Sequence, residues 1–383
     1  MAQAQGLVLR PRAFMQIQGQ ELAPTSLFAA ARDAFAEAVG RARRSVIHDH
    51  LVGGRHVRLH FANEALVPIL TPALAHHPHP PPESVPRLTV HVWDSLSTGL
   101  RESPLDWLPE DLPPTPEVRV SNGSMLLVFT TTSGILRLLN LPEKVALYWA
   151  ADPQQVSDVE RSTPFLLFLQ GLLRGPETQV VHGAAVGTPE GCVLLAGRGG
   201  AGKSTSALAC LVAGMRYVGD DYCLLSRRPE PRAFNLFNSG KLNGDSLARL
   251  PQLIPHVVNP ARKPGEKSVF FFRDDWGDQL APSLPIRAVL LPRVSGGRDT
   301  TLRPASAAEG IKALAPSTIF QLTGPGATTF RMLADFLRCV PCHHLLVGTD
   351  LGQIPRAIGR LLADSDGRPP APDPIRNPDA LTR

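Results

Sequence analysis

The chain has 383 residues, a formal net charge of +5 and 19% charged residues. This length is sufficient for two or three domains, and the mild charge without a long basic run argues against a nucleic-acid partner. Five cysteines in so long a chain do not indicate a disulfide scaffold, and no apolar run approaches the roughly 20 residues of a membrane span. Residues 1–6 are polar and do not resemble a leader. We therefore expect a cytoplasmic protein without a membrane partner, and the oligomeric state, including a homo-oligomer, stays open.

Residues 1–160 predict a mixed α+β domain that serves accessory or substrate-recognition functions. Thr25-Ser26 can cap an amphipathic helix that continues to Val39, and Asn63 can cap another helix. The run 55–61 alternates apolar and polar residues as a half-buried strand does. Further strands are expected at 7–17, 88–93, 118–128 (a hairpin centred on Asn122-Gly123), 134–139 and 144–150.

Three histidines lie in the run His76-His-Pro-His-Pro-Pro-Pro82. Such a cluster can bind metal, but polyproline favours an extended, exposed segment, and no second ligand cluster stands nearby in the sequence. We therefore interpret residues 76–82 as a linker.

Residues 161–363 alternate strands and helices, which predicts an α/β domain. A helix is expected at 164–173, and later ones at 307–314, 328–338 and 351–362. Residues 364–383 are rich in Pro and Asp and have the composition of a disordered tail.

The segment Gly197-Arg-Gly-Gly-Ala-Gly-Lys-Ser204 fits G-x-x-x-x-G-K-[ST], between an apolar run (192–196) and a helix-like stretch (204–212). Glycines let the backbone turn tightly around phosphate, Lys203 can reach the β- and γ-phosphates, and Ser204 can ligate Mg²⁺. The alternative is a Gly-rich turn that only caps a helix. We expect ATP to be bound by Gly197, Arg198, Gly199, Gly200, Ala201, Gly202, Lys203, Ser204 and Thr205.

A carboxylate for Mg²⁺ is expected near the end of an apolar strand. Asp220-Asp221 follows the helix of the loop, and adjacent side chains at a strand end diverge enough for separate tasks. The alternative is an acidic turn without a function.

Only six lysines occur in the chain, so most positive charge is carried by Arg. A lysine that persists in such a chain can mark a need for a compact ammonium, as at a phosphate. Besides Lys203, this singles out Lys241 and Lys267, together with Arg293, each equally compatible with an ordinary surface cation.

The run Cys339-Val-Pro-Cys342-His343 matches a haem-attachment pattern. Without an export leader or a second Cys pair, a strand at 340–347 explains it better than haem or zinc.

The order of these motifs resembles the C-terminal domain of the HPr kinase/phosphorylase family and its wider phosphoenolpyruvate-carboxykinase-like fold. The matching features are the His-Gly strand at 180–187, the loop, and Gly219-Asp220-Asp221. The chain is similar in particular to HPr-kinase-related proteins of peptide-modification clusters, including lasso-peptide kinases. The resemblance is strong over 180–225 and weaker elsewhere.

The resemblance implies Asp220 as the catalytic base, Asp221 with Ser204 on the metal, and an active-site role for His182. The glycine motif adds Lys203 as a phosphate ligand, and the scarcity of lysine, independently of the family, adds Lys241 as a second candidate. The long Arg-, Gly- and Ile-rich signature that follows the aspartates in the HPr enzymes is absent from residues 227–242, which makes HPr an unlikely substrate and phosphorylase activity doubtful.

We therefore expect an ATP- and Mg²⁺-dependent kinase that transfers phosphate to a hydroxyl, with Ser or Thr of a peptide or protein other than HPr as the acceptor. A small-molecule hydroxyl kinase and a nucleotide-sensing module without catalysis are the alternatives. The sequence does not identify the acceptor.

Overall fold

The computed structural model describes residues 7–8, 16–17, 20–21, 24–42, 44–100, 117–121, 124–321 and 326–364. The chain divides into two compact units, Met1–Leu172 and Leu173–Arg383. This division falls within α5 (Leu166–Leu173), whereas the sequence places it after residue 160. The expected tail lies outside the described residues apart from Asp364. None of the described helices combines the length and the apolar character needed to cross a membrane.

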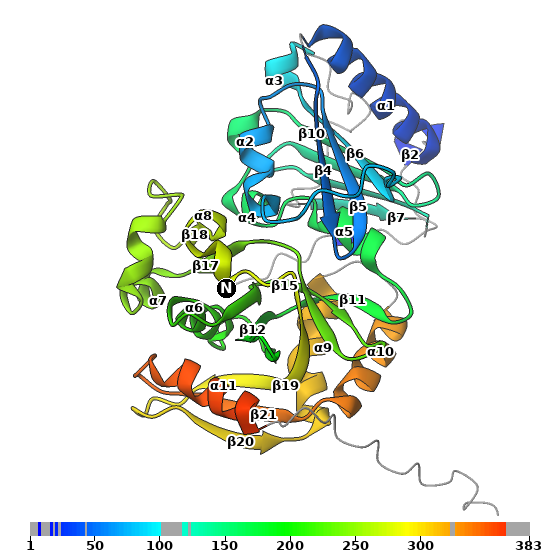
Figure 1. Ribbon diagram of the computed structural model, residues 1–383. Helices are drawn as coiled ribbons and strands as arrows, with labels where there is room; N and C mark the ends of the chain where they lie inside the picture. Colours follow the sequence, from blue (N-terminus) through cyan, green and yellow to red (C-terminus); the bar gives the residue numbers. More distant parts are fainter. Residues whose placement is uncertain are drawn as a thin grey trace, which may run out of the picture. The chain divides into compact units, whose positions relative to one another are not determined.

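In the described part of the N-terminal unit, eight strands form one mixed sheet in the order β1-β7-β8-β9-β10-β6-β5-β4 (Figure 1). Both faces of this sheet are covered: Trp149 of β10 belongs to the core beneath α1, and the neighbouring Tyr148 meets the ring of Phe165 at 5.5 Å. The strands of the unit are β1 (Leu7–Val8), β2 (Gln16–Ile17), β3 (Gln20–Glu21), β4 (Val46–Val52), β5 (Arg55–Phe61), β6 (Leu88–Asp94), β7 (Glu117–Ser121), β8 (Met125–Thr130), β9 (Ile135–Asn140) and β10 (Val145–Ala150). Its helices are α1 (Pro24–Arg41), α2 (Val67–Leu70), α3 (Ser95–Thr98), α4 (Asp158–Ser162) and α5.

Most strands of this unit begin and end within a residue or two of the prediction. Asn63 does not cap the helix expected after it. Its Oδ1 accepts from the N–H of Ala65 at 3.0 Å, and α2 begins only at Val67, without a side-chain cap. The helix expected from residue 164 begins at Leu166, after a left-handed Phe165 with φ of 58°. The hairpin centre 122–123 and residues 9–15 of the first expected strand lie outside the described residues.

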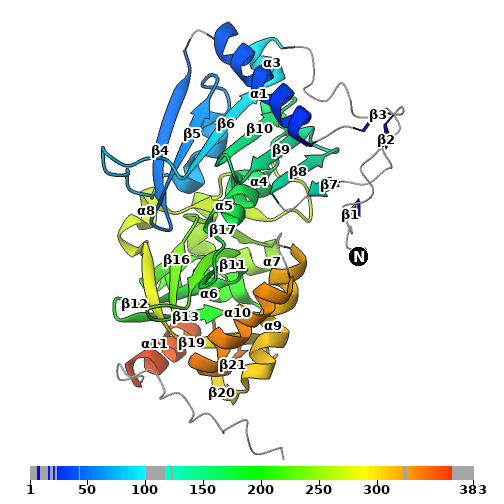
Figure 2. The same ribbon diagram turned by 90° about the vertical axis from the view of Figure 1, so that its right-hand side faces the viewer.

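In the described part of the C-terminal unit, nine strands form a mixed sheet with the path β11-β15-β16-β19-β13-β12-β14, to which β21 is added beside β19 and β20 beside β21 (Figure 2). The strands are β11 (Thr178–His182), β12 (Ala184–Thr188), β13 (Gly191–Leu195), β14 (Arg216–Gly219), β15 (Tyr222–Ser226), β16 (Arg232–Asn235), β19 (Ser283–Val294), β20 (Thr301–Ala305) and β21 (Cys342–Val347). A separate hairpin consists of β17 (Ser239–Leu242) and β18 (Ser268–Phe271). The helices are α6 (Lys203–Val212), α7 (Gly244–Ala248), α8 (Arg273–Trp276), α9 (Ala307–Gln321), α10 (Gly326–Cys339) and α11 (Gln353–Asp364).

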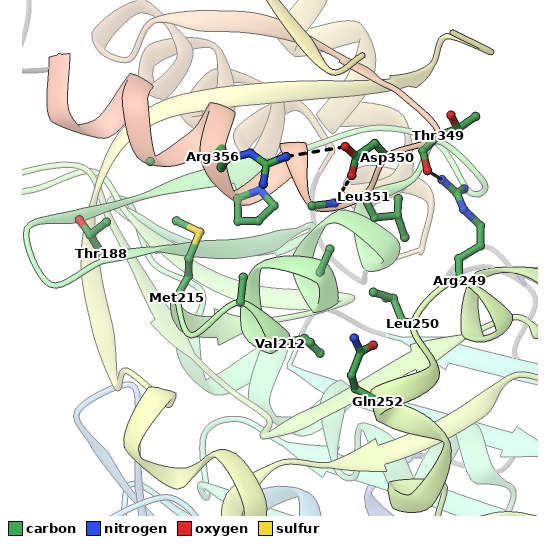
Figure 3. A pocket seen from close by; sticks show the side chains of 15 residues that line it. Thr188, Val212, Met215, Arg249, Leu250, Gln252, Thr349, Asp350, Leu351 and Arg356 are labelled. Atoms are coloured by element: carbon green, nitrogen blue, oxygen red, sulfur yellow. Dashed lines mark hydrogen bonds and ion pairs between the residues drawn. The ribbon is translucent and has the colours of Figure 1, made fainter. Parts of the chain in front are cut away.

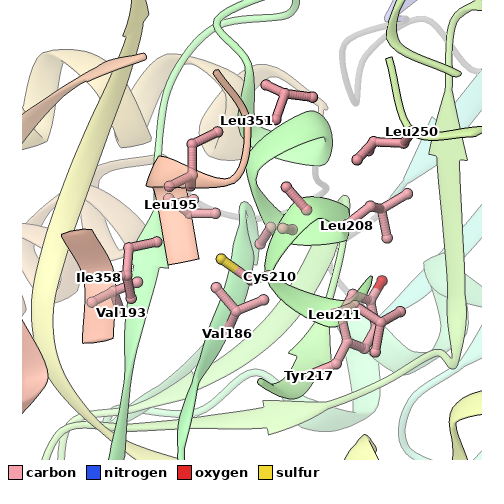
Figure 4. Close-up of a cluster of buried hydrophobic side chains, with 14 of the residues drawn as sticks. Val186, Val193, Leu195, Leu208, Cys210, Leu211, Tyr217, Leu250, Leu351 and Ile358 are labelled. Carbon is pink, nitrogen blue, oxygen red and sulfur yellow. The ribbon is translucent and has the colours of Figure 1, made fainter. Parts of the chain in front are cut away.

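Helices cover both faces of this sheet, so the unit is α/β as the sequence predicts. Val193 and Leu195 of β13 pack beneath α6 and α11, as Figure 4 shows, whereas the alternate residues Cys192 and Leu194 pack beneath α9 and α10. The strict alternation of strand side chains therefore gives two separate cores, one on each face. The β17–β18 hairpin packs on the same side as α6, through Leu242 and its neighbours.

The pairing of β12 with β13 leaves no room for a side chain at Gly187, because a Cβ there would overlap the carbonyl oxygen of Gly191 and the Cα of Cys192. We expect Gly187→Ala to lower the free energy of unfolding by more than about 2 kcal/mol. The two atoms that the new Cβ would overlap belong to the backbone of β13, and the pairing of β12 with β13 prevents them from moving away. Urea unfolding of the full chain measures this.

The matched control is Gly359→Ala in α11, where a Cβ meets nothing within 4 Å. That variant should be neutral or more stable by up to about 1 kcal/mol. Equal midpoints for the two variants would contradict the packing described for Gly187.

Candidate functional site

The strand, loop and helix expected from the glycine motif are present in the C-terminal unit. β13 ends at Leu195, residues 197–202 form the glycine loop, and α6 begins at Lys203. Gly200 and Gly202 have φ of 81° and 101°, which residues with a Cβ rarely adopt. The loop tip at residues 198–200 is exposed, and the first N–H groups of α6 have no acceptor within their own helix. The loop therefore offers backbone donors to an anion.

The Lys203 side chain is buried within the glycine loop. Its ammonium donates to the carbonyl oxygens of Gly197 at 2.8 Å and Arg198 at 3.2 Å. Burial lowers the pKa of Lys203, and the carboxylates of Asp220 and Asp221 oppose that shift. A buried cation thus lies between the loop and the two aspartates. The hydroxyl of Thr205, also expected at the nucleotide, donates instead to Ser246 Oγ at 2.9 Å.

Asp220 and Asp221 form the tight connection between β14 and β15. Asp221 has φ of 62°, a left-handed conformation that Asp tolerates better than most residues. The carbonyl of Asp221 accepts from the N–H of Gly183 at 3.0 Å, and the carbonyl of Asp220 accepts from Tyr222 at 2.8 Å. Gly183 itself lies between β11 and β12. The chain crosses from one side of the sheet to the other both at Gly183 and at Asp220-Asp221, and the hydrogen bond from Gly183 to Asp221 joins these two connections.

The two carboxylates point to different partners. The Ser204 hydroxyl lies near Asp220 and acts to lower its pKa, and Asp220 Oδ2 accepts from the N–H of Lys241 at 3.4 Å. The other oxygen, Oδ1, is buried without a hydrogen-bond partner among the described residues. Burial, aided by the charge of Asp221, raises the pKa of Asp220 to about 6.

Asp221 forms an ion pair with Lys241, 2.6 Å from its Oδ2, and His182 Nε2 lies 3.8 Å from its Oδ1. Burial raises the pKa of Asp221, but the Lys241 ammonium, aided by His182 and Lys267, holds that pKa well below its ordinary value. The structure thus brings together His182, Lys241 and Asp221 on one side, and Lys203, Ser204 and Asp220 on the other. Ser204 lies near Asp220, whereas the sequence grouped it with Asp221 as a metal ligand.

Two contacts that the sequence did not predict hold the strand that carries Lys241, β17, in place. Gly240 has the ring of Phe272 so close that a Cβ would stand 2.8 Å from it, and Tyr217 donates its hydroxyl to the carbonyl of Ser239 at 2.7 Å. Both contacts fix strand β17 against its neighbours. The contacting residues are distant in sequence, so no local pattern announces them.

The other two candidate cations are exposed. Lys267 immediately precedes β18, and its charge contributes to the low pKa of Asp221 and to the lowered pKa of Lys203. Arg293 lies near the end of β19. Lys267 therefore acts on the aspartates through space, whereas Lys241 touches one of them.

A cavity of about 870 Å³ lies away from this site, between the end of α6 and the start of α11 (Figure 3). Arg249 donates to the carbonyl of Thr349 there at 3.1 Å, and Arg356 pairs with Asp350 at 3.7 Å. None of residues 197–204 lines it. The residues that the motif singles out therefore lie outside this cavity.

Comparison with known proteins gives little beyond these observations. No family model and no curated protein matches the chain. Among solved structures, the chain is similar to the Hpr(Ser) kinase/phosphatase from Coxiella burnetii, with 13% identity and a TM-score of 0.28 over 49% of this chain and 95% of that one. A similarity at this level assigns no function.

The unlike pKa shifts predict opposite stability effects for two isosteric substitutions. A carboxyl with a raised pKa binds its proton more tightly in the folded state, so stability falls as pH rises from about 4 to 6. Asp220→Asn should therefore stabilise the metal-free protein at pH 7.5 by on the order of 1–2 kcal/mol, with no gain at pH 4. Asp221→Asn should destabilise it by about 3 kcal/mol at pH 7.5, because Lys241 loses its buried partner.

Thermal unfolding of both variants between pH 4 and 7.5 tests this pair. The loss in Asp221→Asn should stay nearly constant over this range, since a lowered pKa contributes its stability in full above the unfolded value of 3.8. A decrease in Tm of equal size for both variants at pH 7.5 would contradict the electrostatic difference between the two aspartates.

Proposed function

We propose that this protein is an ATP- and Mg²⁺-dependent kinase that transfers the γ-phosphoryl group to a hydroxyl, with Ser or Thr of a peptide or protein other than HPr as the acceptor. The observation that carries the proposal is the grouping of Lys203, Ser204 and Asp220 at the start of α6. A glycine loop that only caps a helix needs neither a buried ammonium nor a buried carboxylate beside it.

The residues present fit Mg²⁺. Asp220 Oδ1 is a buried carboxylate oxygen without a partner among the described residues, and Ser204 brings a hydroxyl to the same carboxylate. Hard oxygen ligands, few from the protein and the rest from phosphate and water, suit this ion. Bound there, Mg²⁺ would neutralise charge on the β- and γ-phosphates.

We accordingly propose the reverse of the aspartate roles that the family resemblance implies. Ser204 and Asp220 would hold the metal, because the Ser204 hydroxyl lies near Asp220 and Asp220 Oδ1 has no hydrogen-bond partner among the described residues. Asp221 would accept a hydrogen bond from the acceptor hydroxyl and take its proton, while Lys241 and His182 keep that carboxylate ionised and oriented. A weak base suffices, because phosphoryl transfer has a loose transition state.

The remaining residues act on the nucleotide. The N–H groups of the glycine loop would bind the β-phosphate, and Lys203 would stabilise charge on the bridging oxygen as its bond to the γ-phosphorus breaks. The acceptor oxygen forms the new bond to phosphorus, and ADP leaves. Lys267 adds positive potential at the aspartates.

The acceptor class is tested by mixing the protein with γ-labelled ATP, Mg²⁺ and three separate acceptors: a Ser/Thr peptide library, HPr, and a set of small hydroxyl metabolites. Label in the peptides alone supports the proposal. Label in metabolites alone selects the small-molecule kinase, and nucleotide binding without any transfer selects the sensing module.

Substitution of the buried lysine tests the nucleotide site. Lys203→Ala should weaken Mg²⁺-ATP binding at least tenfold and reduce transfer by roughly 100-fold or more, because the cation on the β/γ-phosphates is lost. Titration with a fluorescent ATP analogue and the transfer assay measure the two effects. Lys312→Ala, an exposed lysine of α9, is the control and should resemble wild type.

The two aspartates should separate in function. Asp220→Asn should abolish the dependence of ATP affinity on Mg²⁺, whereas Asp221→Asn should keep that affinity and lose transfer by roughly 100-fold. ATP affinities measured with and without Mg²⁺, beside transfer rates, distinguish the two. The opposite pattern would restore Asp220 as base and Asp221 as metal ligand.

A further inference from the structure

Two segments of the N-terminal unit bring histidines together. His48 and His50 are two residues apart in β4, so both side chains lie on one face of that strand. The histidine-proline segment 76–82 runs along the same strand, because the N–H of Leu51 donates to the carbonyl of Pro78 at 2.9 Å. The sequence showed no second ligand cluster near this segment, and the fold supplies one.

The rings gather around His50. Its ring centroid lies 6.3 Å from that of His48, with the planes nearly parallel at 7°, and 6.4 Å from that of His77. The exposed His79 is close enough to act electrostatically on both His48 and His50. The rings of His48 and His77, which come from two segments of the chain, thus lie beside His50, and His79 is within electrostatic range of it.

His50 is the unusual member of this histidine cluster (His48, His50, His77 and His79). Its side chain is buried, with 7% exposure for the residue, and both ring nitrogens lack a hydrogen-bond partner among the described residues. A neutral imidazole has one donor and one acceptor to satisfy. Buried polar groups without partners are rare and often mark a missing ion or water. Burial lowers the pKa of His50 to about 4, so the ring is neutral at pH 7, the form that binds metal.

We propose that the histidine cluster binds one divalent transition-metal ion, Zn²⁺ or a cation of similar preference. Imidazole nitrogens are ligands that Zn²⁺, Cu²⁺ and Ni²⁺ favour. The neighbouring Asp49 is not a ligand, because both its oxygens accept from Arg58 and one also contacts His56. The ion would link the histidine-proline segment to the edge strand β4. This role does not depend on any kinase activity.

The rings need only a small movement to reach this geometry. With Zn–N bonds near 2.0 Å at tetrahedral angles, two ligating rings have centroids about 5 Å apart. The distances of 6.3 and 6.4 Å exceed this by about 1 Å, and in the described part of the chain no three such groups already converge on a metal position. His48, His77 and His79 are not fully buried, so side-chain rotation of these three toward His50 closes the site.

The test titrates untagged, metal-free full chain with ZnCl₂ in a calorimeter. We expect one Zn²⁺ per chain, and at least tenfold weaker binding in His50→Gln and in His77→Gln. His60→Gln, a half-buried histidine on the neighbouring strand β5, is the matched control and should bind as wild type. Asp220→Asn should also bind as wild type, which excludes the aspartates of the C-terminal unit.

X-ray absorption of the wild-type zinc complex provides a measurement that does not depend on the folding of a variant. It should show a nitrogen shell at about 2.0 Å with imidazole scattering beyond it. Failure to saturate at about 100 µM ZnCl₂, equal affinities for wild type, His50→Gln and His77→Gln, or a shell without imidazole would each overturn the proposal.

Discussion

The candidate site depends on the burial of two adjacent carboxylates. Asp220 and Asp221 repel each other where both are largely buried, and only one has an ammonium in contact, Lys241 at 2.6 Å from Asp221. The unequal pairing drives their pKa values apart, up for Asp220 and down for Asp221. Neighbouring acids whose environments separate their pKa values are common where a protein assigns them different chemical tasks.

Much of the C-terminal unit serves to place cations beside this pair. The glycine loop holds Lys203 through two carbonyl oxygens, and the β17–β18 hairpin, packed on the side of α6, carries Lys241. The turn between β14 and β15 is itself held by the N–H of Gly183. The glycine loop, the β17–β18 hairpin and the β14–β15 turn, which are distant in sequence, therefore meet around the two aspartates.

Both proposals begin from a buried polar group that the fold leaves without a partner. Asp220 Oδ1 and the ring nitrogens of His50 are such groups among the described residues, one in each unit. Each destabilises the folded chain unless something binds it, so each points to a ligand by the same physical argument. The ligands differ because the donors differ: oxygens suit Mg²⁺, and imidazoles suit a transition metal.

Local patterns in the sequence were enough to predict the strand, glycine loop and helix at 191–212, the α/β character of the C-terminal unit and most strands of the N-terminal one. These features follow from the side-chain period and from glycine conformation, which neighbouring residues decide. Only the tertiary structure decided three other features: the position of Ser204 near Asp220, the ion pair of Lys241 with Asp221, and the approach of residues 76–82 to His48 and His50. They join residues far apart in the chain, and burial, which sets their charges, exists only once the sheets have packed.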